Sequence, residues 1–394
     1  MNRFRPPRRR RASVPVCEAL EARELLSSAP WLDHTLDGSR AVAEVRTHPD
    51  AQKQKTPIVT RLAAQPAASV STVPSNGDVN PYATAVVPSG FPAGGPLKAG
   101  DILVTNFNSS SNLQGTGSTL VSITPSGNQS VFYQGPAGTG LSSALGVLKR
   151  GFVIVGNIPG TYDSKGNLES VGNGSLTILD RFGHVAATLT DPNLIAGPWG
   201  VAINDQGNKA QVFVTNVLNG MVTRIDLKVP IKGDKIAVQD MVQVGSGFSQ
   251  RADPVAFWLG PTGLAFNAKT DVLYVASTED NAIFAISGAA KTRGQSGTGA
   301  AVYNDPAHLR GPLGLLLAPN GDLLTTNGDA INSDPNQSSE LIEFTQRGQF
   351  VGQLSLDSAQ GAAFGLTLAT SRRRLELATV NDATNTLDER FIPL

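Results

Sequence analysis

The sequence predicts an all-β protein, a six-bladed β-propeller whose last blade is closed by an N-terminal strand. Three observations predict it: the composition, a strand motif that recurs six times, and a proline-containing connector between copies. The chain has 394 residues, 40% of them hydrophobic, with 41 glycines and 25 prolines. Val, Ile, Thr and Leu stand in short runs between these glycines and prolines, which is typical of many short strands joined by turns.

The recurring motif is an apolar run that ends in a small polar residue and then, usually, Asn. Its six copies end at Asn106, Asn157, Asn216, Ser277, Asn327 and Asn381, at spacings of 51, 59, 61, 50 and 54 residues. Such a period is typical of propeller blades. A glycine-led apolar run precedes most copies, as at Gly200 and Gly263, and an alternating run follows them, as at 282–286. Alternation suits a strand with one buried face, so we expect four strands in each of six units.

A second repeat separates the units. Asp-Pro precedes Gly-Pro by six or seven residues at Asp191 and Gly197, at Asp253 and Gly260, and at Asp305 and Gly311. Proline fixes φ and removes a backbone donor, so Asp-Pro ends an outer strand and Gly-Pro turns the chain into the next inner strand. This pattern predicts a connector from one blade to the next.

Closure of the ring needs a strand from the other end of the chain. We expect residues 57–394 to form the propeller and residues 1–56 to be a disordered basic targeting region and linker. The last unit shows only three strand-like runs before Leu394. Because an unpaired sheet edge templates aggregation, we expect Thr56–Leu62 to complete the last blade. The alternative is that this segment is linker and that the outer edge is short.

Charge and cysteine usage exclude several classes of protein. Six arginines fall within the first eleven residues, and the remainder carries 26 basic against 32 acidic side chains. Without a clustered basic face, the body is not expected to bind nucleic acid. The single Cys17 lies in the tail, so the body contains no internal disulfide and no thiol nucleophile. No apolar run reaches the roughly 18 residues of a membrane-spanning helix. We also expect the protein to be a monomer.

The N-terminal region contains a targeting motif. It lacks the apolar stretch of an ordinary secretory signal, but Leu20-Glu21-Ala22-Arg23 followed by Leu25-Leu26 resembles the LEPR-XLL motif of planctomycete surface and exported proteins, with Ala22 in place of proline. The resemblance implies an extracellular or envelope-associated protein, with a cell-wall glycan or a surface protein as its partner. The alternative is a short amphipathic helix after a basic tail.

The units themselves resemble a known repeat. Residues 273–286, an apolar strand, a short Asp/Asn turn and a second apolar strand, resemble the NHL repeat found in NHL and YncE-like propellers. The resemblance covers residues 80–394 and implies a six-bladed propeller.

Propeller geometry predicts one functional face. The loop after the second strand and the loop entering the first strand of each blade lie on the same side of the disc, which places on one rim Asn106, Asn157, Asn216, Glu279, Asp280, Asn327, Asp329, Asn381 and Asp382. The connectors add Trp199, Trp258, Phe364 and His308. Such a rim could hold a sugar or an oxygen-loving cation such as Ca²⁺. The alternative is structural, since Asn and Asp bond their own backbone in turns and tryptophan packs between blades.

Catalytic motifs are scarce. Of the four histidines, only His308 can reach the rim, so a multi-histidine metal centre is excluded. Gly-x-Ser-x-Gly and phosphate-binding loops are absent. The best enzymatic alternative resembles gluconolactonase-like propellers, in which a divalent cation polarises the lactone carbonyl; Glu279, Asn216, Asn327 and Asp382 offer suitable oxygens. That family has an acid at the start of an inner strand, where this chain has glycine or a small residue.

We therefore predict a ligand-binding or scaffold module that acts through one face of the disc. Metal-assisted lactone or ester hydrolysis is the alternative, and a purely structural role in a cell-surface layer is the third hypothesis. The sequence leaves open whether any reaction is catalysed.

Overall fold

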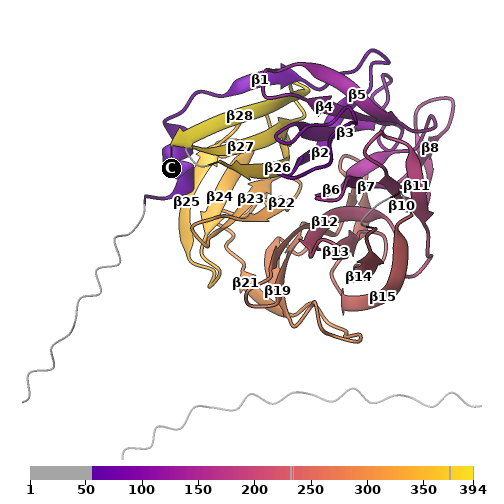
Figure 1. Cartoon of the computed structure of the whole chain (residues 1–394). Helices are drawn as coiled ribbons and strands as arrows, with labels where there is room; N and C mark the ends of the chain where they lie inside the picture. The colour runs from indigo at the N-terminus through magenta and orange to yellow at the C-terminus, as the bar shows by residue number, and fades with distance from the viewer. Residues whose placement is uncertain (1–55, 231–232, 234, 372–373, 394) are drawn as a thin grey trace, which may run out of the picture. The chain divides into compact units, whose positions relative to one another are not determined.

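The computed structural model describes residues 56–230, 233, 235–371 and 374–393. Within them lie six four-stranded antiparallel sheets, arranged radially as the blades of a propeller (Figure 1), and two short hairpins. The all-β, six-bladed fold predicted from the repeats is confirmed. The basic tail and the LEPR-XLL-like motif lie outside the described residues.

Blades 1 to 3 follow one another along the chain. Blade 1 comprises β2 (Val79–Val86), β3 (Ile102–Asn108), β4 (Thr119–Ile123) and β5 (Gln129–Gln134). Blade 2 comprises β6 (Leu141–Leu148), β7 (Phe152–Asn157), β10 (Ser175–Leu179) and β11 (Val185–Leu189), with the hairpin of β8 (Gly160–Tyr162) and β9 (Leu168–Val171) inserted after β7. Blade 3 comprises β12 (Pro198–Asp205), β13 (Lys209–Asn216), β14 (Met221–Lys228) and β15 (Ala237–Ser246).

Blades 4 to 6 complete the ring. The hairpin of β16 (Arg251–Asp253) and β17 (Phe257–Leu259) precedes blade 4, which comprises β18 (Pro261–Asn267), β19 (Val272–Ser277), β20 (Ala282–Ser287) and β21 (Ala300–Tyr303). Blade 5 comprises β22 (Pro312–Leu317), β23 (Leu323–Asn327), β24 (Glu340–Phe344) and β25 (Phe350–Ser355). Blade 6 comprises β26 (Ala363–Thr370), β27 (Arg374–Asn381), β28 (Thr386–Pro393) and β1 (Ala68–Ser71).

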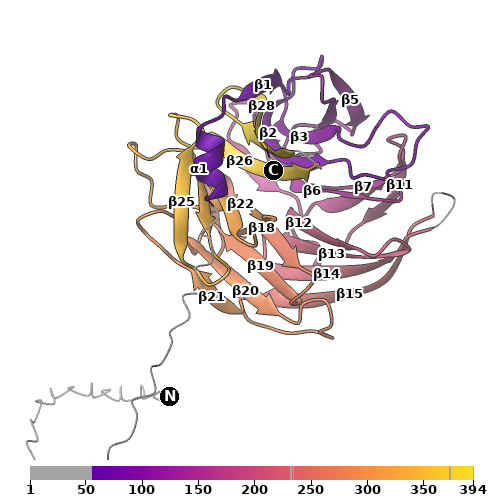
Figure 2. The same ribbon diagram turned by 60° about the vertical axis from the view of Figure 1, so that its left-hand side comes forward.

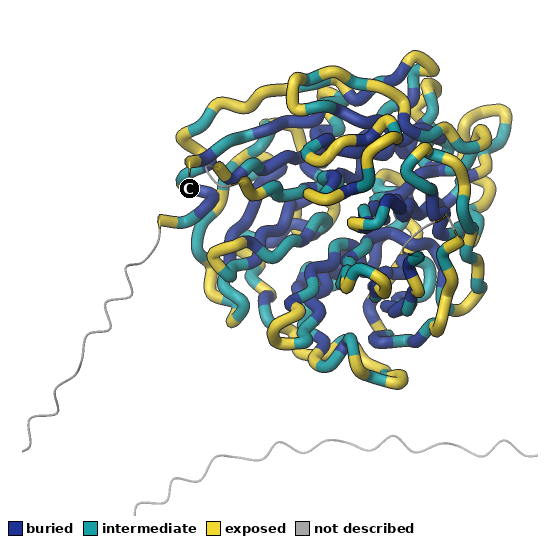
Figure 3. Tube along the Cα trace, in the orientation of Figure 1, coloured by how far each residue is buried: buried dark blue, intermediate teal, exposed yellow. Residues whose placement is uncertain are grey.

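The recurring sequence motifs occupy equivalent places in the blades. Each glycine-led run lies in an inner strand, and each alternating run lies in the third strand. Each copy of the recurring motif lies in the second strand and ends with it, except in blade 1, where β3 continues for two residues beyond Asn106. The burial differs from the expectation of one buried face, because every residue of β4 and of β24 is buried. A blade packs against a neighbour on each side, so its third strand has no solvent face, and exposure is concentrated in loops and outer strands (Figure 3).

The strand predicted to close the ring was placed wrongly. Thr56–Leu62 does not form a strand, because residues Ile58–Ala63 form the helix α1. The outer strand of blade 6 is instead β1, which pairs antiparallel with β28 from Ala68 opposite Glu389 to Ser71 opposite Thr386.

Helix α1 forms because its apolar side chains and its first turn both find partners. Ile58, Val59 and Leu62 are buried in a cluster with residues of blades 5 and 6, and the helix packs against β25 (Figure 2). The Val59 amide donates a hydrogen bond to Glu343 Oε2 at 2.9 Å. This carboxyl is fully buried, and burial raises its pKa despite that hydrogen bond. The helix therefore joins blade 5 to the closing blade.

Neighbouring inner strands approach one another closely around the axis. A Cβ at Gly200 would lie 2.0 Å from Thr262 O, and one at Gly263 would lie 2.3 Å from Leu313 O. Only glycine permits this approach. Between the strands, Thr215 Oγ1 accepts a hydrogen bond from Gly200 N at 2.7 Å and donates one to Thr262 O at 2.7 Å. A single hydroxyl thus satisfies the bulged backbone of one blade and bridges it to the next.

Hydroxyl bridges of this kind recur at five of the six junctions within the described residues. The donors and acceptors are Thr105 Oγ1 to Ser142 O, Ser142 Oγ to Pro198 O, Thr215 Oγ1 to Thr262 O, Thr278 Oγ1 to Pro312 O, and Thr326 Oγ1 to Phe364 O. At the junction of blades 6 and 1 the corresponding position is Val380, which has no hydroxyl. At this junction Val70 of β1 packs against an apolar cluster that includes Val380 of blade 6 and Val104 of blade 1.

Replacing Thr215 with valine tests the bridge. Thr215→Val keeps the shape but leaves the Gly200 N–H and the Thr262 carbonyl without their partner, and we expect the free energy of unfolding to fall by about 1–3 kcal/mol. Urea unfolding measures it. Thr188→Val, at an exposed position of the outer strand β11, serves as the control and should change stability by less than about 0.5 kcal/mol. Equal effects of the two substitutions would contradict the bridge.

A pair of truncations tests the closure. A chain beginning at Thr72 lacks α1 and β1, which exposes the edge of β28 and the apolar cluster under α1. We expect it to melt at a lower temperature and to aggregate. The reference is a chain beginning at Thr56, so that only α1, β1 and the residues joining them differ between the two. Identical melting curves would show that the closing strand contributes nothing.

Candidate functional site

Two of the Asn residues predicted to line a rim fasten the connectors of their own blades. Asn216 Oδ1 accepts a hydrogen bond from Ala196 N at 3.0 Å, and Asn327 Oδ1 accepts one from Arg310 N at 3.0 Å. Both Asn side chains are fully buried. They are therefore part of the folded framework and are not presented on a surface.

The other three Asn side chains are also buried and engaged. Asn106 Nδ2 donates to Thr72 O at 2.9 Å, Asn157 Nδ2 donates to Ser175 Oγ at 2.7 Å, and Asn381 Nδ2 donates to Asp357 Oδ2 at 2.7 Å. The Asn tip of each motif thus marks a structural bond at the end of the second strand.

Glu279 and Asp280 hold the segment between blades 3 and 4. Arg251 Nε donates to Glu279 Oε1 at 3.0 Å. Asp280 Oδ2 accepts hydrogen bonds from Ser277 Oγ at 2.6 Å and from Ser249 N at 3.1 Å. Both carboxylates therefore have protein partners that anchor this connector.

His308 and Trp258 lie outside the cavities described below. His308 Nδ1 lies 2.6 Å from Asp305 Oδ2, and its ring stacks on Phe350 at 3.7 Å. Trp258 Nε1 donates to Gln250 Oε1 at 2.8 Å. Both side chains are thus tied to neighbouring residues of connectors and an outer strand.

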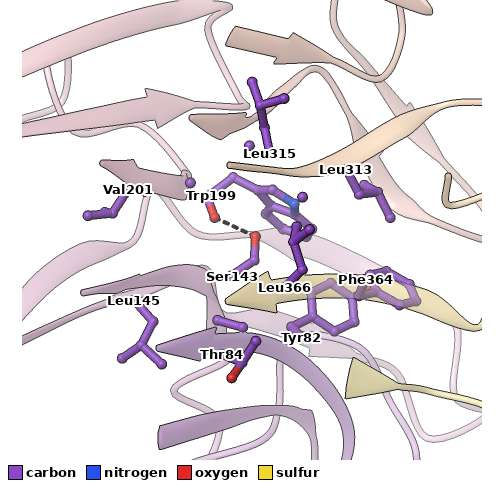
Figure 4. Close-up of a pocket in the computed structure, with 15 residues that line it drawn as sticks. Tyr82, Thr84, Ser143, Leu145, Trp199, Val201, Leu313, Leu315, Phe364 and Leu366 are labelled. Carbon is purple, nitrogen blue, oxygen red and sulfur yellow. Dashed lines mark hydrogen bonds between the residues drawn. The ribbon is translucent and has the colours of Figure 1, made fainter. Parts of the chain in front are cut away.

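A small cavity on the axis is lined by all six inner strands (Figure 4). Its volume is about 80 Å³, and no charged side chain lines it. Trp199, only 3% exposed, lies in it beside Tyr82 and Phe364, and Ser143 Oγ donates to its carbonyl oxygen. A cavity with this lining offers no ligand set for a hard cation.

Aromatic rings close one end of this cavity. Tyr82 stacks on Phe364 at 4.4 Å and meets Trp199 edge-on at 5.5 Å, while Phe107 meets both Trp199 at 5.5 Å and Phe257 at 5.3 Å. Phe257 comes from the β16–β17 hairpin between blades 3 and 4, and its side chain contacts the aromatic ring of Phe107 in blade 1. Its backbone is left-handed, with φ of 67°, and its ring is 1% exposed. Burial of the ring holds this unfavourable conformation.

A larger cleft, which we call the acidic cleft, lies beside these rings and shares Tyr82 and Phe364 with the axial cavity. Its volume is about 440 Å³, within the range of small-molecule sites. Its polar lining includes Asn80 of blade 1, Asp253 of the β16–β17 hairpin, Asp329 of blade 5 and Asp382 of blade 6, together with Gln114 and Gln360. No Lys, Arg or His lines it.

Asp382 is the least compensated of these acids. It follows Asn381 at the end of β27, and no described residue donates a hydrogen bond to its carboxylate or forms an ion pair with it. Burial raises its pKa to about 6. Burial, with Asp382 as a second cause, also raises the pKa of Tyr82. The cleft therefore holds a carboxyl group that exchanges its proton near neutral pH.

Asp329 and Asn80 each present an oxygen without a protein partner. Asp329 Oδ2 accepts hydrogen bonds from Ser339 N at 2.9 Å and Gly361 N at 3.0 Å, but its Oδ1 has no partner, and burial raises the pKa of this carboxyl. Asn80 Oδ1 is likewise without a partner. Both residues have left-handed backbones, with φ of 55° and 60°, a conformation that Asp and Asn tolerate.

Asp253 differs because it is already paired. Arg251 Nη1 donates to its Oδ2 at 2.7 Å, and the amides of Val255 and Ala256 donate to its Oδ1 at 2.9 and 2.8 Å. Burial opposes ionisation, but these hydrogen bonds outweigh it and lower the pKa of Asp253.

Of the residues predicted for the rim, the acidic cleft brings together Asp329, Asp382 and Phe364. Sequence reasoning missed Asn80 and Tyr82 as site residues, and it took Asp253 for a connector residue. The sequence does mark Asn80. Blade 1 has Asn-Pro at the position where three other blades have Gly-Pro.

The described residues do not form the metal site that lactone hydrolysis would need. No group of three or more His, Cys, Asp or Glu side chains among them is placed to hold an ion. Of the four oxygen donors considered for that chemistry, only Asp382 lines the cleft, whereas Asn216 and Asn327 are buried in the framework and Glu279 is paired with Arg251.

No protein-family model matches the chain, and no curated protein matches it. Among solved structures, the chain is similar to a gluconolactonase from Xanthomonas campestris, at 13% identity and a TM-score of 0.44, over 84% of this chain and 92% of that one. It is also similar to a calcium-binding protein, regucalcin, from Agrobacterium tumefaciens, at 11% identity and a TM-score of 0.49, over 83% and 95% of the two chains. Similarity at this level assigns no activity to the chain.

The raised pKa of Asp382 predicts how stability depends on pH. A carboxyl whose folded pKa lies above its unfolded value binds its proton more tightly when folded, so stability falls as pH rises from about 4 to about 7. We expect Asp382→Asn to be more stable than the native protein at pH 8, by about 2 kcal/mol, and equal to it near pH 4. Urea unfolding at both pH values measures this.

The control variant, Asp253→Asn, should change stability in the opposite direction. The pKa of Asp253 is lowered, so its ionised form stabilises the fold, and Asp253→Asn should be less stable than the native protein at pH 8. A loss of stability in Asp382→Asn at pH 8 would contradict the environment assigned to Asp382.

Proposed function

We propose that this protein is a ligand-binding propeller whose binding site is the acidic cleft. The observation that carries the proposal is that Asp382 and Asp329 line a cleft, and that no described residue donates a hydrogen bond to the Asp382 carboxylate or to Asp329 Oδ1. Polar groups withdrawn from water are ordinarily hydrogen-bonded, because an unpaired buried oxygen costs free energy. A ligand that donates hydrogen bonds would satisfy both oxygens.

The remaining lining suits a ligand with both polar and apolar faces. Phe364 offers aromatic surface, and Gln114 and Gln360 offer amides that donate and accept. Few convergent polar groups around an aromatic surface are typical of small-molecule sites. Hydroxyl-rich or amine-bearing ligands present the donors that this lining lacks.

The cellular setting belongs to the same proposal. The LEPR-XLL-like motif supports an exported or envelope-associated protein, and the NHL-like repeats support a binding or scaffold module. A ligand derived from the cell wall is compatible with both the setting and the donors that the cleft requires. Among the described residues, no helix is long and apolar enough to cross a membrane.

A panel of small sugars, amino sugars and amines tests the proposal. We expect at least one ligand to raise the melting temperature, since binding to the folded state stabilises it, and isothermal titration calorimetry then gives its affinity. Asp382→Asn should lower the affinity for that ligand by about tenfold or more, because one hydrogen bond to a charged group is lost.

Asp240→Asn is the matched control, because Asp240 is exposed on the outer strand β15 and does not line the cleft. It should leave the affinity unchanged. The proposal fails if no ligand of the panel binds, or if Asp382→Asn binds the hit as tightly as the native protein.

Hydrolysis is the second candidate, and one observation favours it. A carboxyl with a pKa of about 6 in an open cleft can accept and return a proton near neutral pH. Ca²⁺ would take carboxylate and amide oxygens, but the described residues do not bring such a set together, so no step is assigned to it. A pH-stat assay with lactones, comparing the native protein with Asp382→Asn, separates this candidate from binding alone.

A further inference from the structure

The acidic cleft carries negative charge that the protein neutralises only in part. Of the three aspartates in its lining, Asp253 is paired with Arg251, and no cationic side chain lines the cleft. Arg310 lies near Asp329 and acts on it electrostatically, but its guanidinium donates to Ala307 O at 3.2 and 3.1 Å. Neither arginine donates a hydrogen bond to Asp329 or to Asp382.

Aromatic surface adjoins this charge. The partly exposed ring of Phe364 lines the same cleft as Asp382, and the buried ring of Tyr82 stacks behind it at 4.4 Å. The face of an aromatic ring attracts an organic cation, and the attraction grows when water is excluded. Carboxylates and aromatic rings together recognise an ammonium group by complementary means: the carboxylates supply charge and the rings supply apolar contact.

We infer that the ligand of the acidic cleft is a small organic cation that carries a protonated or quaternary amine. This inference rests on the proposed function and narrows it. Among the alternatives, an anion is repelled by Asp382 and Asp329, a neutral sugar leaves Asp382 without a counter-charge, and a bare divalent cation requires more converging oxygens than the described residues bring together. An ammonium group needs only one or two carboxylates.

The affinity for such a ligand should depend on pH in a defined direction. The groups that face Asp382 in the cleft are Asp329, Asp253, Asn80 and Tyr82, and none of them is a cation. A permanently charged ligand should bind more tightly as pH rises through about 6, where Asp382 becomes ionised. Any such dependence comes from the protein, because a quaternary amine does not titrate.

Two matched pairs of probes test the inference in the full chain: choline with its neutral analogue 3,3-dimethylbutan-1-ol, and glucosamine with glucose. By isothermal titration calorimetry at pH 7, where the Asp382 carboxyl is mostly ionised and the glucosamine amine is mostly protonated, we expect the charged member of a pair to bind about tenfold or more tightly than the neutral one. Lowering the pH to 5 should weaken the binding of choline. Asp382→Asn should abolish both the preference and the pH dependence, whereas Asp240→Asn should retain them.

The outcomes separate this inference from the proposed function. If the neutral members bind as tightly as the charged ones, the ligand is not selected by charge and the inference is wrong, although the cleft still binds ligands. Retention of the preference by Asp382→Asn would place the cation elsewhere and would also overturn it. If none of the four probes binds while the wider panel yields only an uncharged ligand, the inference is again overturned and the proposed function stands.

Discussion

The close approach of neighbouring inner strands around the axis is the constraint on which the rest of the structure depends. Gly200 and Gly263 lie where any side chain would collide with the next strand, and hydroxyls such as that of Thr215 bind the bulged backbone on both sides. Because the strands are this close, the axis leaves room for only a small cavity, which is filled from one end by aromatic rings. A ligand of any size must therefore bind beside the axis rather than along it.

The β16–β17 hairpin follows from this arrangement. It brings Phe257, in a left-handed conformation, from the segment between blades 3 and 4 to the aromatic rings near blade 1. It also carries Asp253 and Val255 to the cleft. One insertion thus packs behind the rings that line the axial cavity and forms part of the wall of the acidic cleft, while the Arg251–Glu279 ion pair ties it to blade 4.

The polar residues of this face divide into two groups with opposite energetic roles. The buried Asn side chains find partners and stabilise the connectors, as Asn327 does with Arg310 N. Asp382 and Asp329 Oδ1 lack donors, and ionisation of such groups costs stability. Groups that destabilise the fold and line a cleft are typical of functional sites, whereas the satisfied Asn residues explain the regular repeat.

The fold class, the number of blades, and the places of the glycine-led and Asn-tipped runs could be predicted from the amino-acid sequence, because these features repeat with similar local chemistry along the chain. It also pointed to Asp329 and Asp382. The tertiary structure alone decided which polar side chains are satisfied, since the partner of Asn216 or Glu279 comes from another segment. It also decided that α1 occupies the expected closing strand, because Ile58 and Val59 gain burial and Val59 gains the Glu343 carboxylate only once blades 5 and 6 are assembled.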